Sequence, residues 1–253
     1  MLKTAELMKA YRIARLKLKA ESQRTYVGYL WWFIQPVLDL GIYYLLFSVI
    51  LKRGGEDYLL FLFLGLVMWK WLVQIVLSSC GSLVGNKGLI LSFPTTKYVY
   101  PATDTFMHTI KFLPVLLICV VGYAAFYGVS VHHLELLPLV LTQFILCLSC
   151  SFFCAAIIPF LLDLQLIFPV LVRLLFYPSG ILFDPVKLSD KMQRYIYLNP
   201  LVGMFESYRN ILMKGKGANW GSLLAILIFS AAIGSLGLWI LEKNNKRYAK
   251  MRF

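Results

Sequence analysis

Charged side chains are scarce in this sequence of 253 residues. Aspartate, glutamate, lysine and arginine together make up 15% of it, whereas they make up about one-quarter of a typical soluble domain. Apolar residues reach 60% and are gathered into long runs. This composition excludes a large soluble enzyme domain. It predicts an all-α polytopic membrane protein whose single transmembrane domain occupies 1–253.

A catalytic or nucleotide-binding motif is also lacking. Only three histidines are present, and the adjacent pair His132 and His133 would point apart on a helix or a strand. Gly81–Gly88 (GSLVGNKG) lacks the G-x-x-x-x-G-K-[ST] spacing of a phosphate-binding loop. We therefore expect a chain that is not an enzyme and binds no cofactor. If ATP drives it, a separate polypeptide hydrolyses the ATP.

Metal ligands and a targeting segment are equally hard to find. Cys147, Cys150 and Cys154 share a helical face in an apolar run, but no histidine or carboxylate accompanies them. Packing as small apolar side chains is therefore favoured over a metal site. No signal peptide is recognisable, because the first apolar run begins too late and is too long.

What is present is a series of apolar runs, each long enough to cross a membrane. A helix rises about 1.5 Å per residue, so about 20 residues cross a hydrocarbon core of roughly 30 Å. The fourth and fifth runs are too long for one crossing, and Pro159, Asp163 and Pro169 mark a turn that divides them. The six predicted spans are 29–51, 58–80, 101–127, 136–162, 164–183 and 221–241.

Basic residues gather at both ends of the chain. Seven lysines and arginines precede the first predicted span, and five follow the last one. An even number of spans puts both termini on one side, and the positive charge predicts that this is the cytoplasmic side of the inner membrane. The loop 81–100 then also faces the cytoplasm, and 184–219 faces outward. The net charge of +13 thus indicates topology and affinity for anionic lipid headgroups rather than for nucleic acid.

Two amphipathic segments are predicted to lie at the membrane surface. Within 1–27, the apolar spacing favours an interface helix over a solvated basic tail. Within 184–219, an apolar stripe predicts an interfacial or re-entrant helix that is too short to span. The apolar positions are Leu7, Tyr11, Ala14 and Leu18 in the first segment, and Met204, Phe205, Tyr208, Ile211 and Leu212 in the second.

Charges within the apolar runs are the sharpest functional clue. A charge in hydrocarbon costs on the order of 3 kcal/mol, so each should face a partner, a cavity or water. Such charges could line a polar route for a hydrophilic substrate. Alternatively, Asp39 could pair with a lysine or arginine to lock helix packing, or a long side chain could snorkel; a route is favoured only for Arg173. The four charges are Asp39, Lys70, Lys111 and Arg173.

Aromatic residues are abundant, at 15%. Near the outer ends of the first and fifth spans, their rings could pack on the apolar faces of sugars. An interface belt or ordinary packing is the alternative for any single ring. With two of the charges, these rings give the candidate substrate channel: Trp32, Asp39, Tyr43, Tyr44, Phe47, Arg173, Phe176, Tyr177 and Phe183.

Several short motifs occur in an order that is more specific than any one of them. They are Tyr26-Val-Gly28-Tyr-Leu-Trp31-Trp32 before Pro36, Asn86-Lys-Gly-Leu89-Ile90 with Phe93-Pro94, Asp163, and Leu198-Asn199-Pro200 with Glu206 and Arg209. In this order and spacing, nearly the whole chain resembles the membrane subunits of type-2 ABC exporters, in particular the O-antigen polysaccharide permeases. One departure is Leu162, where the family often has an arginine before the turn acid.

The resemblance implies a homodimer with a translocation path between the protomers for a lipid-linked polysaccharide. It also implies two copies of a separate ABC ATPase, which use ATP and magnesium on the cytoplasmic face. Segment 86–97 resembles the coupling helix that docks into the ATPase, and its apolar centre with polar ends suits docking; a simple membrane-surface loop is the alternative. The coupling residues are Asn86, Lys87, Leu89, Ile90, Phe93, Pro94 and Lys97, and the outward-gate residues are Asn199, Pro200, Glu206 and Arg209.

Other transporters stay open as alternatives. Within the family, the cargo could be a capsule or teichoic-acid polymer, a drug or a lipid. Outside it, an ion-coupled secondary transporter would use Asp39, Lys111 or Arg173 as coupling charges. Inverted repeats would be expected in such a transporter, and none is visible. A membrane-embedded transferase would need a catalytic set that this sequence lacks.

Overall fold

The computed structural model describes residues 4–23, 26–50, 57–92 and 95–250, and most of these residues are helical. No β-strand occurs among them, in agreement with the predicted all-α class. Helices satisfy backbone hydrogen bonds within one segment, as hydrocarbon surroundings require. In chain order the elements are α1 (Thr4–Ser22), η1 (Gly28–Leu30), α2 (Trp31–Tyr44), η2 (Leu45–Ile50), α3 (Tyr58–Cys80), α4 (Lys87–Ser92), α5 (Val99–Tyr127), η3 (Val131–Glu135), α6 (Leu136–Ile157), η4 (Ile158–Phe160), α7 (Leu164–Phe176), η5 (Tyr177–Ser179), η6 (Pro185–Lys187), α8 (Asp190–Ile196), α9 (Pro200–Met213), α10 (Trp220–Lys243) and α11 (Asn245–Lys250).

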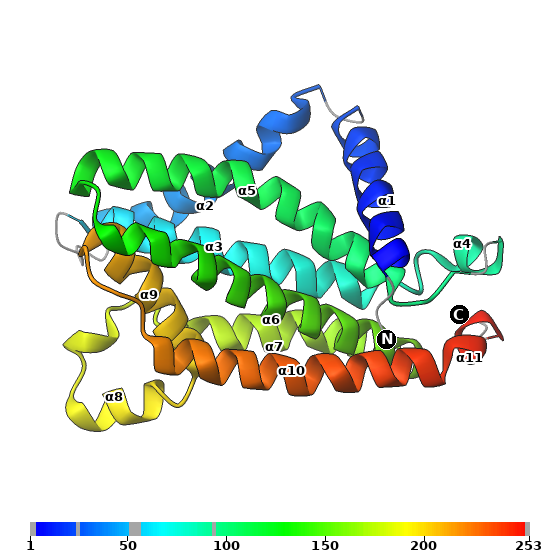
Figure 1. The fold of residues 1–253 in the computed structure, drawn as a ribbon. Helices are drawn as coiled ribbons and strands as arrows, with labels where there is room; N and C mark the ends of the chain where they lie inside the picture. Colours follow the sequence, from blue (N-terminus) through cyan, green and yellow to red (C-terminus); the bar gives the residue numbers. More distant parts are fainter. Residues whose placement is uncertain (1–3, 24–25, 51–56, 93–94, 251–253) are drawn as a thin grey trace.

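In the described part of the chain, four helices are long and apolar enough to cross a membrane. They are α3, α5, α6 with the short helices that flank it, and α10, and they run alongside one another (Figure 1). Two further apolar segments accompany them. These are α2, which continues as the π-helix η2, and α7, which continues as η5. Each of the six segments overlaps one predicted span, although α5 begins two residues before its predicted start and α10 extends beyond both predicted ends. Residue 51, the predicted end of the first span, lies outside the described residues.

The fifth apolar segment ends earlier than its composition suggests. The apolar run predicts a span over 164–183, but α7 ends at Phe176 and the chain turns after η5. Pro178 departs from helical dihedral angles, and Gly180 has a φ of 71°, in the left-handed region. A Cβ at Gly180 would also lie 2.9 Å from Cγ of Pro185. Phe183 therefore belongs to the turn after α7 and not to a spanning helix.

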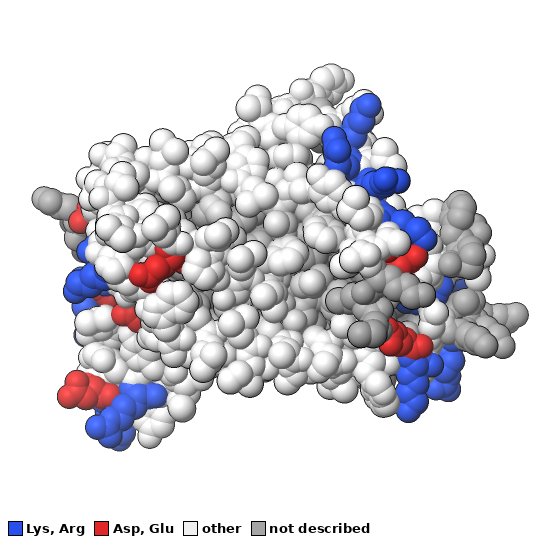
Figure 2. All heavy atoms as spheres, in the orientation of Figure 1, with Lys and Arg blue, Asp and Glu red and all other residues white. Residues whose placement is uncertain are grey.

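The two ends of the bundle differ in content. Both termini, α4 and α11 lie at one end, whereas α8 and α9 lie at the other (Figure 1). On the visible face, charged residues gather near the two ends and a broad uncharged band separates them (Figure 2). Such a band is typical of a surface that faces lipid. An even number of crossings requires both termini to lie on the same side, and they do lie at the same end of the bundle (Figure 1).

Helices α6 and α10 pack against each other more extensively than any other pair of described helices. Gly237 of α10 faces α6, where an added Cβ would lie 2.7 Å from the backbone nitrogen of Phe153. At Gly234, a Cβ would lie 2.6 Å from Oγ of Ser149. Small residues let helix backbones approach closely in membranes, where van der Waals packing drives helix association. The two glycines thus set the separation of α6 and α10.

We expect Gly237→Leu to push α10 away from α6 and to destabilise the protein by about 1–3 kcal/mol, the usual cost of overpacking. The thermal unfolding temperature of the purified protein in detergent measures the loss. Gly122→Leu in α5 is a matched control, because nothing lies within 4 Å of its Cβ position. Equal unfolding temperatures for the two variants would contradict the close approach of α6 and α10.

The N-terminal helix α1 runs across the bundle instead of along it (Figure 1). It packs on α5 and buries Ala10, Ala14 and Leu18. Tyr11, which the pattern places in the apolar stripe, lies at its edge with 39% of its surface exposed, and its ring is 6.1 Å from that of Phe106. This crossing direction suits the predicted interface helix. The described helix extends from Thr4 to Ser22, within the predicted 1–27.

Candidate coupling segment, channel and outward gate

The predicted coupling segment begins as the short helix α4, at the end of the molecule that holds both termini (Figure 1). Ile90 is buried in an apolar cluster with residues of α1, α5 and α11. Its neighbours Leu89 and Leu91 are 44% and 60% exposed. Before the helix, Nδ2 of Asn86 donates to the backbone oxygen of Ser82 at 2.6 Å and closes the turn. One apolar side chain thus anchors α4, while two remain at the surface.

The helical part of this segment is shorter than the predicted 86–97. It begins at the half-buried Lys87 and ends at Ser92, and residues 95–98 form a non-helical turn. Lys97 is buried, and its Nζ donates to the backbone oxygen of Thr95 at 3.3 Å. Burial lowers the pKa of Lys97. Lys97 therefore supports the loop from within. Two predicted coupling residues lie outside the described residues: Phe93 and Pro94.

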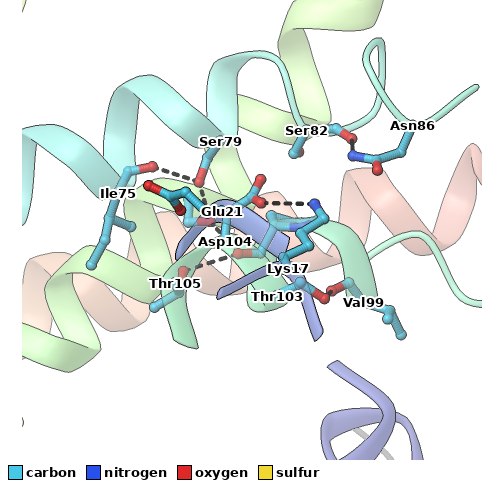
Figure 3. Close-up of polar contacts among 12 residues, drawn as sticks. Lys17, Glu21, Ile75, Ser79, Ser82, Asn86, Val99, Thr103, Asp104 and Thr105 are labelled. Carbon is cyan, nitrogen blue, oxygen red and sulfur yellow. Dashed lines mark hydrogen bonds and ion pairs between the residues drawn. The ribbon is translucent and has the colours of Figure 1, made fainter. Parts of the chain in front are cut away.

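Helix α1 connects the coupling segment with the membrane helices. Glu6 accepts from Nζ of Lys9 at 2.7 Å and from Oγ1 of Thr96 at 3.1 Å. These two donors hold the pKa of Glu6 below its usual value. Further along α1, Nζ of Lys17 donates to Asp104 of α5 at 3.4 Å, as Figure 3 shows. A displacement of the loop after α4 can therefore act on α5 through α1.

The channel candidates of α2 make contacts with the neighbouring helices. Asp39 forms an ion pair with Lys70 of α3, which corresponds to the packing interpretation of this charge. Trp32 lies at the other end of α2, with its ring centroid 5.9 Å from Nζ of Lys111. Tyr44 is exposed. The side chains of two further candidates lie outside the described residues: Tyr43 and Phe47.

The channel candidates of α7 divide into exposed and buried side chains. Arg173 and Tyr177 are exposed, and the exposed leucine Leu174 accompanies them. Phe176 is buried, with its ring centroid 5.7 Å from that of Trp69 on α3. Phe176 therefore belongs to the core of the subunit. The exposed candidates thus lie on two segments that both pack against α3: Tyr44 on α2, and Arg173 with Tyr177 on α7 and η5.

The outward-gate candidate Arg209 is a cross-link between three parts of the chain. Only 2% of it is exposed, although it carries a charge. Its Nη1 donates to the backbone oxygen of Gly180 at 2.6 Å, and its Nη2 donates to that of Ile181 at 3.1 Å. Nε and Nη2 both donate to the backbone oxygen of Phe61 at 3.3 Å, and the guanidinium lies 3.5 Å from the centroid of the Phe61 ring. Arg209 thus fastens α9 to α3 and to the turn after α7.

The other gate candidates organise the outward segment itself. Oδ1 of Asn199 accepts from the backbone nitrogen of Leu201 at 3.1 Å, which caps α9, and Pro200 takes the first helical position. Glu206 accepts from the hydroxyl of Tyr197 at 2.8 Å and so joins α9 to α8. The sequence between the fifth and last spans therefore folds as two short helices that are tied to each other and to the bundle.

Residues 16–213 match the ABC-2 type transporter family. The chain belongs to this family. The match confirms the resemblance to type-2 ABC exporters that the order of the motifs predicts. The sequence that follows residue 213 contains α10 and α11, which complete the helical bundle of this ABC-2 transporter.

Named relatives of this ABC-2 chain are similar over most of their length. The O-antigen export system permease protein RfbA of Klebsiella pneumoniae is 28% identical over 243 residues, which cover 94% of this chain and 93% of the relative. The protein of the same name from Myxococcus xanthus is 26% identical over 248 residues with the same coverage. The polysialic acid transport protein KpsM of Escherichia coli is 26% identical over 219 residues, or 84% of each chain.

Two groups of contacts in this ABC-2 chain were missed by the sequence interpretation. One is the ion pair between Lys111 and Glu21, which joins α5 to the end of α1. The other is the set of carbonyl oxygens around Arg209. A charge within an apolar run needs a partner, so the sequence indicates that Lys111 is paired. It does not indicate that Glu21 on α1 is this partner.

Proposed function

We propose that this chain is the permease subunit of an ATP-driven exporter, which moves a lipid-linked, O-antigen-like polysaccharide across the inner membrane. The observation that carries the proposal is the structure of α4. It is anchored by Ile90 and presents Leu89 and Leu91 at the end of the bundle where both termini lie. Membership of the ABC-2 family and the names of the relatives support the same function.

In this proposal, the end with the termini faces the cytoplasm and binds an ABC ATPase subunit. Seven basic residues before the first span and five after the last support this orientation. The exposed leucines of α4 supply the apolar centre that a protein interface needs, and the polar loop around them supplies its rim. The ATPase uses ATP and magnesium, while this chain binds neither and responds to the movement of its partner.

Two copies of the chain form the translocation path in this proposal. Arg173 is exposed on an otherwise apolar helix, where contact with lipid would cost on the order of 3 kcal/mol. A second copy that faces α2 and α7 would instead place Arg173, Tyr44 and Tyr177 beside a hydrated route. Aromatic rings on that route would pack on successive sugar rings as the glycan slides outward. Each copy has its own α4, so the homodimer would bind two ATPase subunits.

A capsule polymer is the second candidate cargo, because relatives named polysialic acid transport protein also match the chain. These relatives align over 84% of this chain, whereas those named O-antigen export permeases align over 94%. The longer alignment favours the O-antigen-like cargo. Transport assays with each lipid-linked polymer distinguish the two.

Coexpression with an ABC ATPase from a neighbouring gene tests the proposal. The tagged chain is expected to copurify with the ATPase as a complex of two copies of each, which native mass spectrometry measures. In liposomes, this complex should move lipid-linked polysaccharide only when ATP is supplied. An ATPase variant without its Walker-A lysine is the control and should abolish transport. Transport by this chain alone on an ion gradient would overturn the proposal.

A further inference from the structure

A cavity of about 260 Å³ lies where the end of α1 meets α2, α3 and α5. Two lysines contribute to its walls, Lys70 from α3 and Lys111 from α5. Trp71 forms part of the wall and stacks on Phe112, with the ring centroids 4.0 Å apart and the planes at 5°. The stacked rings give the cavity a rigid side. The cavity shares Trp32 with the channel candidates, but its two lysines belong to neither the predicted channel nor the gate.

Each of the two lysines pairs with a carboxylate that is more exposed than the lysine itself. Nζ of Lys111 donates to both oxygens of Glu21 at 2.6 Å, and the two side chains are 13% and 49% exposed. Lys70 pairs with Asp39, and these side chains are 19% and 40% exposed. The two lysines are therefore held more deeply than their carboxylate partners, of which Glu21 also lines the cavity. An entering anion could replace a carboxylate without moving either lysine.

One further polar group of the cavity wall, the His108 ring, lacks a partner for one of its nitrogens among the described residues. Nδ1 of His108 is buried and has no hydrogen-bond partner in the part of the chain that the structure describes. Lys17 and Lys111 both act on this ring electrostatically, from α1 and α5. The amides of Gln35 and Gln74 line the same space. Because buried polar atoms are almost always paired, Nδ1 of His108 points to a ligand that supplies a hydrogen-bond partner in this space.

The surroundings of the cavity are suited to a lipid. Trp31 lines the cavity and is 44% exposed, and the preceding Leu30 is 61% exposed. Farther along α2, Val37 and Leu38 are exposed as well. Helix α1 crosses the bundle here with exposed basic residues, which attract anionic headgroups. An apolar chain could leave the cavity along α2 while its headgroup stays between the lysines.

We propose that this cavity binds the phosphate headgroup of a lipid. Lys70 and Lys111 are its cationic contacts, and Glu21 holds Lys111 in place until phosphate displaces the carboxylate. Phosphate oxygens form strong charge-assisted hydrogen bonds with ammonium groups, and lysine commonly binds phosphate as a point charge. The identification of the lipid as the carrier of the exported glycan rests on the proposed function. The phosphate chemistry of the cavity does not depend on it.

Binding of radiolabelled farnesyl diphosphate to the full-length chain in an uncharged detergent tests the proposal. We expect Lys111→Gln and Lys70→Gln to weaken binding by about tenfold or more, because each removes a charged contact. Glu21→Gln should instead strengthen binding by about threefold or more, because it removes the competing carboxylate. Lys243→Gln is the matched control: Lys243 also lies over a tryptophan, 4.4 Å from the Trp239 centroid, but outside the cavity.

The opposite signs separate a binding site from a structural ion pair. Lys111→Gln and Glu21→Gln break the same pair, so damage to the fold would weaken binding in both variants. Weaker binding in both, or equal competition by uncharged farnesol, would overturn the proposal. Competition by phosphatidylglycerol would mean that a membrane phospholipid occupies the cavity. If phosphatidylglycerol does not compete, the cavity binds the lipid that carries the glycan and not a membrane phospholipid. Both results require phosphate binding.

Failure of the cavity and failure of the proposed function give different results. If the wild-type chain binds farnesyl diphosphate but its complex with the ATPase exports no polysaccharide, the phosphate site is supported and the proposed export function is contradicted. If wild type, Lys111→Gln and Glu21→Gln all export normally and none binds farnesyl diphosphate, the export function is supported and the phosphate site is contradicted.

Discussion

Replacing Arg209 with methionine is expected to remove a large share of the net stability of the protein. The guanidinium satisfies the backbone oxygens of Phe61, Gly180 and Ile181, and methionine offers no donor to any of them. A buried polar group without its partner costs about 1–3 kcal/mol. The oxygen of Phe61 keeps its donor within α3, whereas those of Gly180 and Ile181 lie in the turn after α7. Two such losses are substantial beside the roughly 5–15 kcal/mol that separates folded from unfolded protein. The turn after α7 should detach from α9 first.

The temperature at which the purified protein leaves its monodisperse size-exclusion peak measures this loss. Arg173→Met is the control, because Arg173 is exposed on α7 and its replacement leaves no buried oxygen without a donor. Arg209→Lys should lie between the two, since one ammonium on a flexible stem cannot reproduce the planar fork that reaches three carbonyl groups. An Arg209→Met protein as stable as wild type would show that these contacts do not hold α9 in place.

The spanning helices could be predicted from the sequence because their signal is local. Length and hydropathy of each run decide whether it crosses the membrane, and no distant residue has to be known. The end of α7 was harder to predict. Pro178 and Gly180 break the helix, but the apolar run continues through Ile181 and beyond, and composition alone merges the two. The helix-breaking residues Pro178 and Gly180, and not the apolar composition, indicate where α7 ends.

The contacts of the candidate site could be predicted only in part. A buried charge needs a partner, which correctly indicates pairing for Asp39 and Lys111, yet the identity of each partner depends on helix packing. The motif predicts a gate role for Arg209 but not its contacts. Its acceptors are backbone oxygens, which every residue has, so no sequence pattern identifies them. For α4, a helix of six residues is too short for periodicity to separate buried Ile90 from its exposed neighbours.

The double substitution Leu89→Glu with Leu91→Glu is expected to reduce polysaccharide export by about tenfold or more, because it places two charges at the apolar centre of the proposed ATPase contact. Both side chains are exposed, so the subunit should still fold and insert. Export in cells and recovery of the ATPase with the tagged permease are the two measurements. Thermal stability of the isolated permease should stay at its wild-type value.

A substitution of the same kind at the opposite end of the molecule separates coupling from general damage. Val186 in η6 is 55% exposed, similar to Leu89 and Leu91, and η6 contacts α8. Helix α8 lies at the end of the bundle away from both termini (Figure 1). Val186→Glu should therefore leave recovery of the ATPase unchanged.

Ile90→Glu should act differently again, because it places a charge in the cluster that anchors α4 and should destabilise the permease itself. If the double variant recruits the ATPase as well as Val186→Glu does, the exposed leucines of α4 are not the docking surface and coupling must occur elsewhere.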